Sequence, residues 1–188
     1  VNASVALIVP ALNEEETVET AMRSLLAMEY SPMQIIAVDD RSTDATGEIL
    51  DRLALEDKRL KVIHITELPS GWLGKNHAMH IGACQSQSEF ILFTDADVHF
   101  TPDAVAKALG VMVSNDLDHL VLLPSVDVRG FWETLCVWFF GVLLTIGYRP
   151  WRASDPKSKA FIGVGAFNMV RRSVYEKSGG HTALPMEV

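Results

Sequence analysis

The chain contains the segment Phe90-Ile-Leu-Phe-Thr-Asp-Ala-Asp97, in which an unbroken apolar run ends in two carboxylates. Apolar runs of this length without alternation are typical of strands covered on both faces, as in parallel sheets. Residues two apart in an extended chain face the same way, so both carboxylates can reach one hard divalent cation. A lone pair of this kind is more often a solvated acidic loop, so the surrounding motifs have to decide between the two interpretations.

Three more short apolar runs occur, and helical patterns separate them. This alternation of strand and helix predicts an α/β fold with a doubly wound, mostly parallel sheet. In such sheets ligands bind beyond the carboxyl ends of the strands, so the polar loops there are the ones that matter. The three runs are Val5 to Val9, Ile35 to Val38 and Leu120 to Leu123.

Helix starts are marked by capping residues and by apolar stripes. Asn13 precedes a stripe from Val18 to Leu26, and we expect it to be the N-cap, with Glu16 closing a capping box. Ser42 and Thr43 are expected to cap the next helix.

Composition and charge limit the classes of protein to consider. A length of 188 residues fits one domain, residues 1–188, with a full core. The net charge of -8, from 24 acidic and 16 basic residues, predicts no nucleic-acid partner, because such surfaces need basic side chains to neutralise phosphates. Cys84 and Cys136 lie in apolar helical runs and are expected to be buried thiols in a reducing compartment. Starting at Val1 and stopping at Val188, the chain is interpreted as a piece truncated from a longer protein.

Two loops carry further candidate ligands. Asp39-Asp40 ends the second run, where an aspartate can accept a hydrogen bond from a nucleobase or merely cap the next helix. Gly74-Lys75 opens a helix, so Lys75 can meet a phosphate near a helix N-terminus. Neither the P-loop spacing nor the G-x-G-x-x-G pattern is present, which argues against an ATPase or a dinucleotide-binding fold. The histidines His77, His80 and His99 lack the spacing of a metal site and are expected to have surface or packing roles.

The region Phe131 to Tyr148 is rich in aromatic residues and carries no charge from Leu135 onward. A charge-free stretch of this length is short for a bilayer span and fits a buried or an interfacial helix. A core helix and a helix in contact with a membrane surface both remain open at this point.

Four motifs in this order resemble the family-2 glycosyltransferases, each at a predicted strand end or helix start. Two later segments, Gly165 to Tyr175 and Gly179-Gly-His181, are similar to that family's acceptor-side region. The likeness covers nearly the whole chain, and a looser one relates it to the membrane-associated bacterial subgroup that includes hopene-associated glycosyltransferases. The four motifs are Val9-Pro-Ala-Leu-Asn-Glu14, Val38-Asp-Asp-Arg-Ser-Thr-Asp44, Gly74-Lys75 and Thr94-Asp-Ala-Asp97.

The resemblance implies a GT-A, Rossmann-like fold that binds a nucleotide-sugar donor, usually a uridine one, with a divalent cation, Mg2+ or Mn2+. It further implies an inverting transfer to a lipid or glycan acceptor. Asp40 would contact the base, and Lys75 the base or diphosphate. Asp95 would approach the ribose or the metal, and Asp97 would coordinate the metal. The nucleoside pocket would be lined by Pro10, Ala11, Leu12, Asn13 and Glu14.

The family places its catalytic base in an acidic pair shortly after the Gly-Gly segment. That position is expected just beyond Val188, with Glu187 as a weaker candidate, so the fragment is expected to bind donor but turn over poorly. The full-length protein is expected in the cytoplasm at the inner face of the cell membrane, touching it through Phe131 to Tyr148.

Other classes of protein share some of these features. A sugar nucleotidyltransferase needs a Gly-rich basic loop after its first strand, which Pro10 to Glu14 do not supply. A D-x-D-x-T/V phosphatase needs Thr or Val where His99 stands. A non-catalytic nucleotide-sugar-binding or membrane-surface module fits the missing base and stays open.

Overall fold

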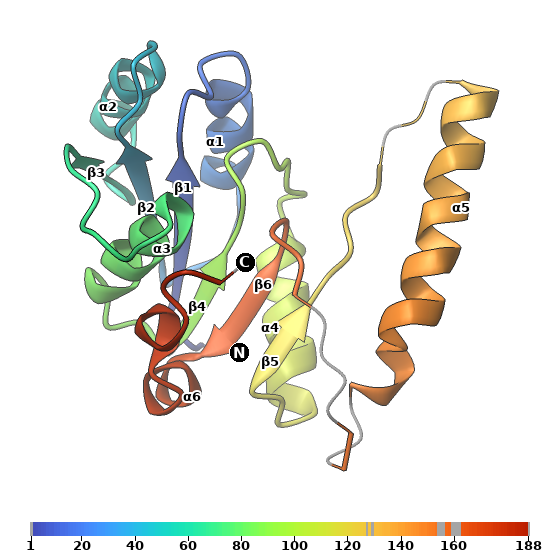
Figure 1. Cartoon of the computed structure of the whole chain (residues 1–188). Helices are drawn as coiled ribbons and strands as arrows, with labels where there is room; N and C mark the ends of the chain where they lie inside the picture. The colour runs from blue at the N-terminus through green and yellow to red at the C-terminus, as the bar shows by residue number, and fades with distance from the viewer. Residues whose placement is uncertain (1, 127, 129, 154–156, 159–162, 188) are drawn as a thin grey trace.

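The computed structural model describes residues 2–126, 128, 130–153, 157–158 and 163–187, and Figure 1 shows a central sheet flanked by helices. The strands are β1 (Val5–Ala11), β2 (Met33–Asp40), β3 (Leu60–Ile65), β4 (Phe90–Phe93), β5 (His119–Val121) and β6 (Asn168–Arg171). The helices are α1 (Val18–Leu26), α2 (Thr46–Glu56), α3 (Gly74–Cys84), α4 (Ala104–Ser114), α5 (Phe131–Tyr148) and α6 (Arg172–Lys177). Two short 3-10 turns are η1 (Pro150–Arg152) and η2 (Gly180–Ala183).

The six strands form one mixed sheet in the order β3-β2-β1-β4-β6-β5. The first four strands of this order are parallel, and β6 runs antiparallel to both β4 and β5. The predicted α/β class with a mostly parallel sheet is therefore confirmed. Because β1, β2 and β4 are parallel, their carboxyl ends share one edge.

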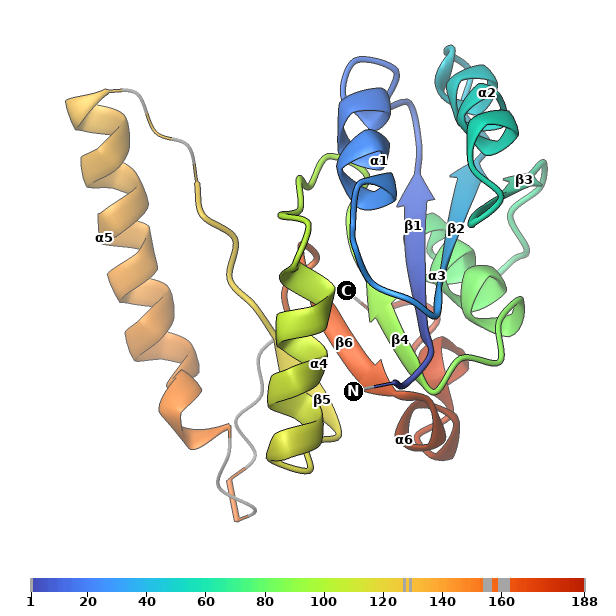
Figure 2. The same ribbon diagram turned by 180° about the vertical axis from the view of Figure 1, so that it is seen from behind.

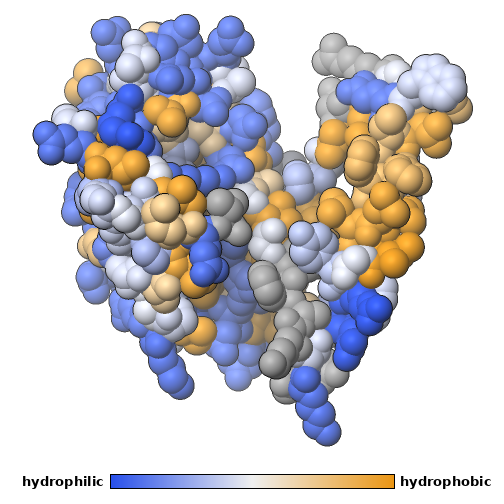
Figure 3. All heavy atoms as spheres, in the orientation of Figure 1, coloured by the Kyte–Doolittle hydropathy of each residue, from blue (hydrophilic) through white to orange (hydrophobic). Residues whose placement is uncertain are grey.

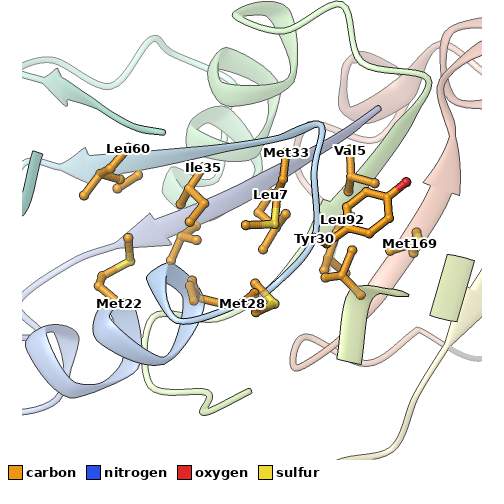
Figure 4. Packing of buried hydrophobic residues seen from close by; sticks show 14 of the residues in the cluster. Val5, Leu7, Met22, Met28, Tyr30, Met33, Ile35, Leu60, Leu92 and Met169 are labelled. Atoms are coloured by element: carbon orange, nitrogen blue, oxygen red, sulfur yellow. The ribbon is translucent and has the colours of Figure 1, made fainter. Parts of the chain in front are cut away.

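The sheet is buried on both faces because its central strands carry apolar residues at successive positions. Figure 2 shows α1, α2 and α4 in front of one face of the sheet. Side chains at alternate strand positions of this face pack against these helices. The other face packs against α3, with Tyr175 of α6 at its margin. Figure 4 shows the first cluster, where Leu7 of β1 and Met22 of α1 belong to one continuous apolar layer. These two layers hold the strand ends in fixed relative positions.

Two features of the sheet differ from the prediction. The run Leu120 to Leu123 is not covered on both faces: β5 is a three-residue edge strand, and Leu123 is 74% exposed. Strands β3 and β6 were not predicted. β3 mixes Lys61 and His64 with apolar residues, and β6 has only four residues, so neither gives a long apolar run.

The predicted helix caps are wrong. The N-cap of α1 is Thr17, four residues after Asn13, and that of α2 is Ala45. Asn13 has a left-handed backbone with φ of 54° and lies in a loop that leads into the helix. Its side chain bonds a neighbouring loop instead, as described below. Asn13 therefore connects two loops and does not cap the helix.

Helix α5 contains no buried residue and stands apart from the sheet in Figure 1, so the core-helix interpretation is wrong. Its aromatic and aliphatic side chains are exposed, Trp138 by 70%. By length and composition alone, the helical stretch Phe131–Arg152 is long and apolar enough to cross a membrane. Cys136 on this helix and Cys84 on α3 are both exposed, so the expectation of two buried thiols is also wrong.

Candidate functional site

A cleft of about 320 Å³ opens at the edge where β1, β2 and β4 end. It brings together residues that are far apart in sequence, including the carboxylates that follow β2 and β4. Every residue predicted on the donor side lines this cleft except Asn13, and Ala96 is the one lining residue that the sequence did not single out. The lining is Pro10, Ala11, Leu12, Glu14, Asp40, Lys75, Asp95, Ala96 and Asp97.

The carboxylate pair lies in a turn after β4, not in the extended chain that the sequence argument assumed. Ala96 is buried while Asp97 is exposed and Asp95 is partly exposed, so both carboxylates lie on the open side of the turn. The Thr94 hydroxyl donates to the Ala166 carbonyl at 2.8 Å, which ties the end of β4 to the segment before β6. Both carboxylates therefore reach one cleft, as predicted, but from a turn and not from an extended strand end.

Asp95 is held by two neighbours. The Lys75 ammonium at the start of α3 donates to Asp95 Oδ1 at 2.5 Å. The backbone N–H of Asp95 donates to the Gly165 carbonyl at 3.1 Å, and a Cβ on Gly165 would meet Asp95 Cγ at 3.0 Å. Gly165 is thus a glycine because the carboxylate occupies the space that a side chain would need.

Asp40 is buried at the end of β2 and is paired with its neighbour Arg41. The guanidinium donates to both carboxylate oxygens, at 2.8 and 3.0 Å, and the hydrogen bond raises the pKa of Arg41. A Cβ on Gly74 would meet Arg41 Nη2 at 2.8 Å and also the carboxylate of Asp40. The first turn of α3 can therefore approach this ion pair only with glycine at its start.

Asn13 shapes the site from outside the cleft by joining two loops. Its backbone N–H donates to Ser42 Oγ at 3.0 Å, and its side-chain carbonyl accepts from the Thr43 N–H at 2.8 Å. The neighbouring Glu14 N–H donates to Thr46 Oγ1 at 2.8 Å. The loops after β1 and β2 are thereby fixed to each other, which positions Glu14 and Asp40 on one wall.

His64 on β3 supports the same wall from behind. Its two ring nitrogens lie 2.9 Å from Asp39 Oδ2 and 3.0 Å from Asp51 Oδ1. These hydrogen bonds, first to Asp39 and then to Asp51, raise the pKa of His64 above its usual 6.5. Asp39 also accepts from the Ser42 N–H at 3.2 Å, so the imidazole is linked through Asp39 to the loop after β2.

We expect His64→Gln to destabilise the fold more at about pH 6 than at about pH 8. A raised pKa in the folded state means that the stabilisation is complete below the unfolded pKa and is lost as the pH rises through the folded one. The effect stays below about 1 kcal/mol, because the imidazole is 42% exposed and its ion pairs are screened. Urea unfolding of both proteins at the two pH values measures it, and a difference independent of pH would contradict the assignment.

Asn76, next to Lys75, fastens the last described segment to α3. Its buried amide donates to the carbonyls of Leu184 at 3.0 Å and Glu187 at 2.6 Å, and the Leu73 N–H donates to the Pro185 carbonyl at 2.9 Å. The Glu187 side chain is exposed and does not line the donor cleft, while Val188 lies outside the described residues. No signal in the sequence pointed to this contact.

Replacing Asn76 by Ala should lower the free energy of unfolding by about 1 to 2 kcal/mol, because the carbonyls of Leu184 and Glu187 lose a buried hydrogen-bond donor. Asn115→Ala is the matched control. Its amide donates to the Val111 carbonyl at an exposed helix end, where a loss below about 0.5 kcal/mol is expected. Chemical denaturation measures both, and equal losses would show that the contact to residues 184–187 adds nothing.

The Gly179-Gly-His181 segment closes onto α6. Both glycines have positive φ, and a Cβ on Gly180 would meet the Tyr175 ring at 2.5 Å. His181 Nδ1 lies 2.8 Å from the Tyr175 hydroxyl, and the imidazole packs edge-on against Phe93 at 4.9 Å between ring centroids. Burial lowers the pKa of His181 to about 4, so this histidine is neutral near pH 7.

The other histidines follow the prediction of packing and surface roles. His80 stacks on Trp72 with ring centroids 5.2 Å apart, His77 packs edge-on against the same ring, and His99 is exposed. Among the described residues, no group of three or more His, Cys, Asp or Glu side chains is arranged to hold a metal ion.

The residues of the cleft still fit a divalent cation that arrives with a phosphorylated ligand. Mg2+ is commonly bound by one or two protein carboxylates, with substrate phosphates and water completing its shell. Asp95 and Asp97 supply two oxygen ligands on the open side of one turn. Lys75 adds a positive charge at the N-terminus of α3, where phosphate is favoured.

Comparison with known sequences gives a consistent result. The model of "Glycosyl transferase family 2" matches residues 6–179. The chain is 30% identical over 184 residues to the "Probable glycosyltransferase YdaM" of Bacillus subtilis, covering 94% of the chain and 42% of that protein. It is 32% identical to the 4,4'-diaponeurosporenoate glycosyltransferase of Staphylococcus haemolyticus, covering 95% of the chain and 47% of that protein. The chain thus spans less than half the length of these relatives.

Solved structures share the fold. A mannosyltransferase from Pyrobaculum calidifontis, in complex with GDP-Man and Mn2+, superposes with a TM-score of 0.72 at 22% identity, covering 96% of this chain and 48% of that one. The S. aureus protein TarS, in complex with UDP-GlcNAc, superposes with a TM-score of 0.67 at 21% identity, covering 94% of this chain and 47% of that one. These similarities show a GT-A, Rossmann-like arrangement of strands and helices.

Proposed function

The chain belongs to glycosyltransferase family 2, and from that premise we propose that it moves a sugar from a nucleoside-diphosphate sugar to an acceptor hydroxyl. One observation carries this proposal most: the carboxylates after β2 and β4 and the ammonium of Lys75 line a single cleft. Such a cleft offers an acceptor for a nucleobase N–H at one end and charges for a diphosphate at the other.

Each lining residue has a proposed part in holding the donor. Pro10 to Glu14 form the nucleoside wall, with Asn13 acting indirectly through the loops that it joins. Asp40 accepts a hydrogen bond from the nucleobase once its ion pair with Arg41 has opened. Lys75 contacts the diphosphate, and Asp95 and Asp97 hold the divalent cation, Mg2+ or Mn2+. The nucleobase is proposed to be uracil; the two structural neighbours described above bind UDP-GlcNAc and GDP-Man.

The proposed reaction is a single inverting displacement. The acceptor oxygen bonds to the anomeric carbon as the bond from that carbon to the β-phosphate oxygen breaks. The nucleoside diphosphate leaves with the bonding electron pair, and the acceptor proton passes to a carboxylate base. A bound cation supplies Lewis-acid stabilisation of the departing diphosphate. Lys75 and the N-terminus of α3 orient the diphosphate and oppose its charge.

The carboxylate base is proposed to lie just past Val188, with Glu187 as the weaker candidate. Asn76 bonds the backbone of residues 184–187, so the chain leading to that position is held beside Lys75. The first turn of α3 would then contact the donor diphosphate through Lys75 and hold, through Asn76, the chain that leads to the base.

Helix α5 is proposed to lie at the inner surface of the cell membrane, not across the membrane. The chain enters the helix from β5 and returns after it to β6, and these strands pair side by side in one sheet. A spanning helix would require residues 149–167 to cross back. Arg149 and Arg152 at the end of the helix favour anionic headgroups, as in interfacial helices. Co-sedimentation with phosphatidylglycerol vesicles tests this, and equal recovery with and without vesicles would contradict it.

Calorimetric titration with UDP and GDP, each with and without Mn2+, tests the donor proposal. We expect one nucleotide to bind more tightly than the other. The cation should strengthen that binding, because the two carboxylates and the two phosphates are its shared ligands. Absence of binding for both nucleotides under all conditions would refute the proposed donor site.

A further inference from the structure

A second cleft, of about 1360 Å³, lies between α5 and the body of the domain. Lys75 and Asp95 line both this cleft and the donor cleft, so the two are continuous at those residues. Figure 3 shows apolar side chains gathered along α5, on the far side of the open space from the body. One end of the second cleft is therefore at the proposed reaction centre, and the rest extends along an apolar helix.

The α5 wall of this cleft is apolar along its length. Val137, Phe140, Leu144 and Tyr148 line it, at the i, i+3, i+7 and i+11 positions of one helical stripe. Phe140 is 61% exposed and Leu144 56%, so this stripe has no partner among the described residues. Contiguous exposed apolar surface of this kind marks a binding site for an apolar ligand or surface.

Most polar side chains on the domain side of the cleft are already bonded within the protein, which argues against a glycan as the occupant. Thr94 donates to the Ala166 carbonyl, Asn76 to the carbonyls of residues 184–187, and Thr145 to the Gly141 carbonyl. His181 is bonded to Tyr175, and Asn168 Oδ1 lies 2.6 Å from His119 Nε2. A sugar chain buries many hydroxyl groups, each of which needs a partner. Polar recognition is left mainly to the end of the cleft at Lys75 and Asp95.

We infer that this cleft binds the acceptor and that the acceptor is an amphiphile with a hydroxyl head and one long apolar chain. The head lies at the Lys75 and Asp95 end, where its oxygen meets the anomeric carbon, and the apolar chain lies along α5. The stretch Cys136 to Tyr148 that lines the cleft is about 18 Å long, at about 1.5 Å per residue. A long alkyl or prenyl chain fits that length. This inference rests on the proposed function and names its substrate class.

The test uses a bromine-labelled hexadecanol, which quenches nearby tryptophan fluorescence, in detergent-free buffer. Trp138 lines the cleft and is the reporter, above a background from Trp72, Trp132 and Trp151 that none of the variants alters. Leu144→Asp places a charge in the cleft, and the matched control Leu143→Asp changes a neighbour that is 49% exposed and does not line it. We expect saturable quenching of the unaltered chain, an affinity at least about tenfold weaker in Leu144→Asp, and little change in Leu143→Asp.

Equal losses in the two variants would mean general adhesion to an apolar helix and would overturn the inference, as would absence of saturable quenching. Maltotriose, a soluble glycan, is the polar probe: protection from quenching by it would assign the cleft to a glycan instead. Circular dichroism confirms that both variants keep their helices. The nucleotide titration is independent of these measurements, so nucleotide binding without alcohol binding overturns only the acceptor class, and absence of nucleotide binding overturns the donor proposal.

Discussion

Replacing Asp97 by Asn is expected to weaken Mn2+-dependent nucleotide binding by about a hundredfold or more, down to the level measured without the cation. Asn keeps the shape of the side chain but removes the negative charge that a hard divalent cation requires. Because Asp97 is exposed, the fold should keep its stability within about 0.5 kcal/mol. Calorimetric titration of the preferred nucleotide, with and without Mn2+, measures the effect directly.

Asp116→Asn is the matched control for this substitution. Asp116 follows α4, its side chain is fully exposed, and its positive φ suits Asn as well as Asp. The control removes the same charge away from the cleft, so Mn2+-dependent binding should be unchanged. If Asp97→Asn also left that binding unchanged, the cation would have to be held elsewhere, and the assignment of both carboxylates after β4 would be withdrawn.

The second large effect is expected from Gly165→Ala, which adds one methyl group beside Asp95. The new Cβ would meet the Asp95 carboxylate, with Cγ at 3.0 Å and Oδ1 at 3.1 Å. The backbone bond from Asp95 N to the Gly165 carbonyl fixes the main chain, so the carboxylate has to rotate away from Lys75. A ligand displaced by about 1 Å can cost about a hundredfold in a reaction that depends on geometry.

Gly163→Ala is the control for Gly165→Ala, because a Cβ there meets, among the described residues, only Asn168 Nδ2 at an ordinary 4.0 Å. We expect Mn2+-dependent nucleotide affinity to fall in Gly165→Ala and to be kept in Gly163→Ala, with similar unfolding curves for both proteins. A fall of the same size in both variants would instead point to a change in the whole segment before β6.

The sheet and its ligand-binding edge could be predicted because strands buried on both faces have an easily recognised sequence pattern. β1, β2 and β4 carry unbroken apolar runs, since both sides of each strand pack against helices. Parallel strands then fix the common edge, and polar residues at their ends had to converge there. The convergence of the loops that carry Asp40, Lys75 and Asp97 followed from this topology, and the resemblance to the family singled out these residues within the loops.

Details that depend on contacts between distant segments were not predictable in the same way. Asn13 is a good capping residue type, yet its side chain joins the loop after β2 because the α1 helix starts five residues later, at Val18. Asn76 carries no motif that points to residues 184–187. The exposure of α5 was one of two open alternatives, since hydropathy alone does not say whether an apolar helix is covered.

Two adjacent residues at the start of α3 serve different partners: Lys75 bonds Asp95, and Asn76 bonds the backbone of residues 184–187. One turn of helix thus contacts both the proposed donor cleft and residues 184–187, and thermodynamic coupling between two such contacts is reciprocal. If an arriving donor favours one conformation of the terminal segment, that conformation must raise the affinity for donor by an equal factor. Under that condition, a ligand that docks on residues 184–187 would regulate donor affinity without touching the nucleotide.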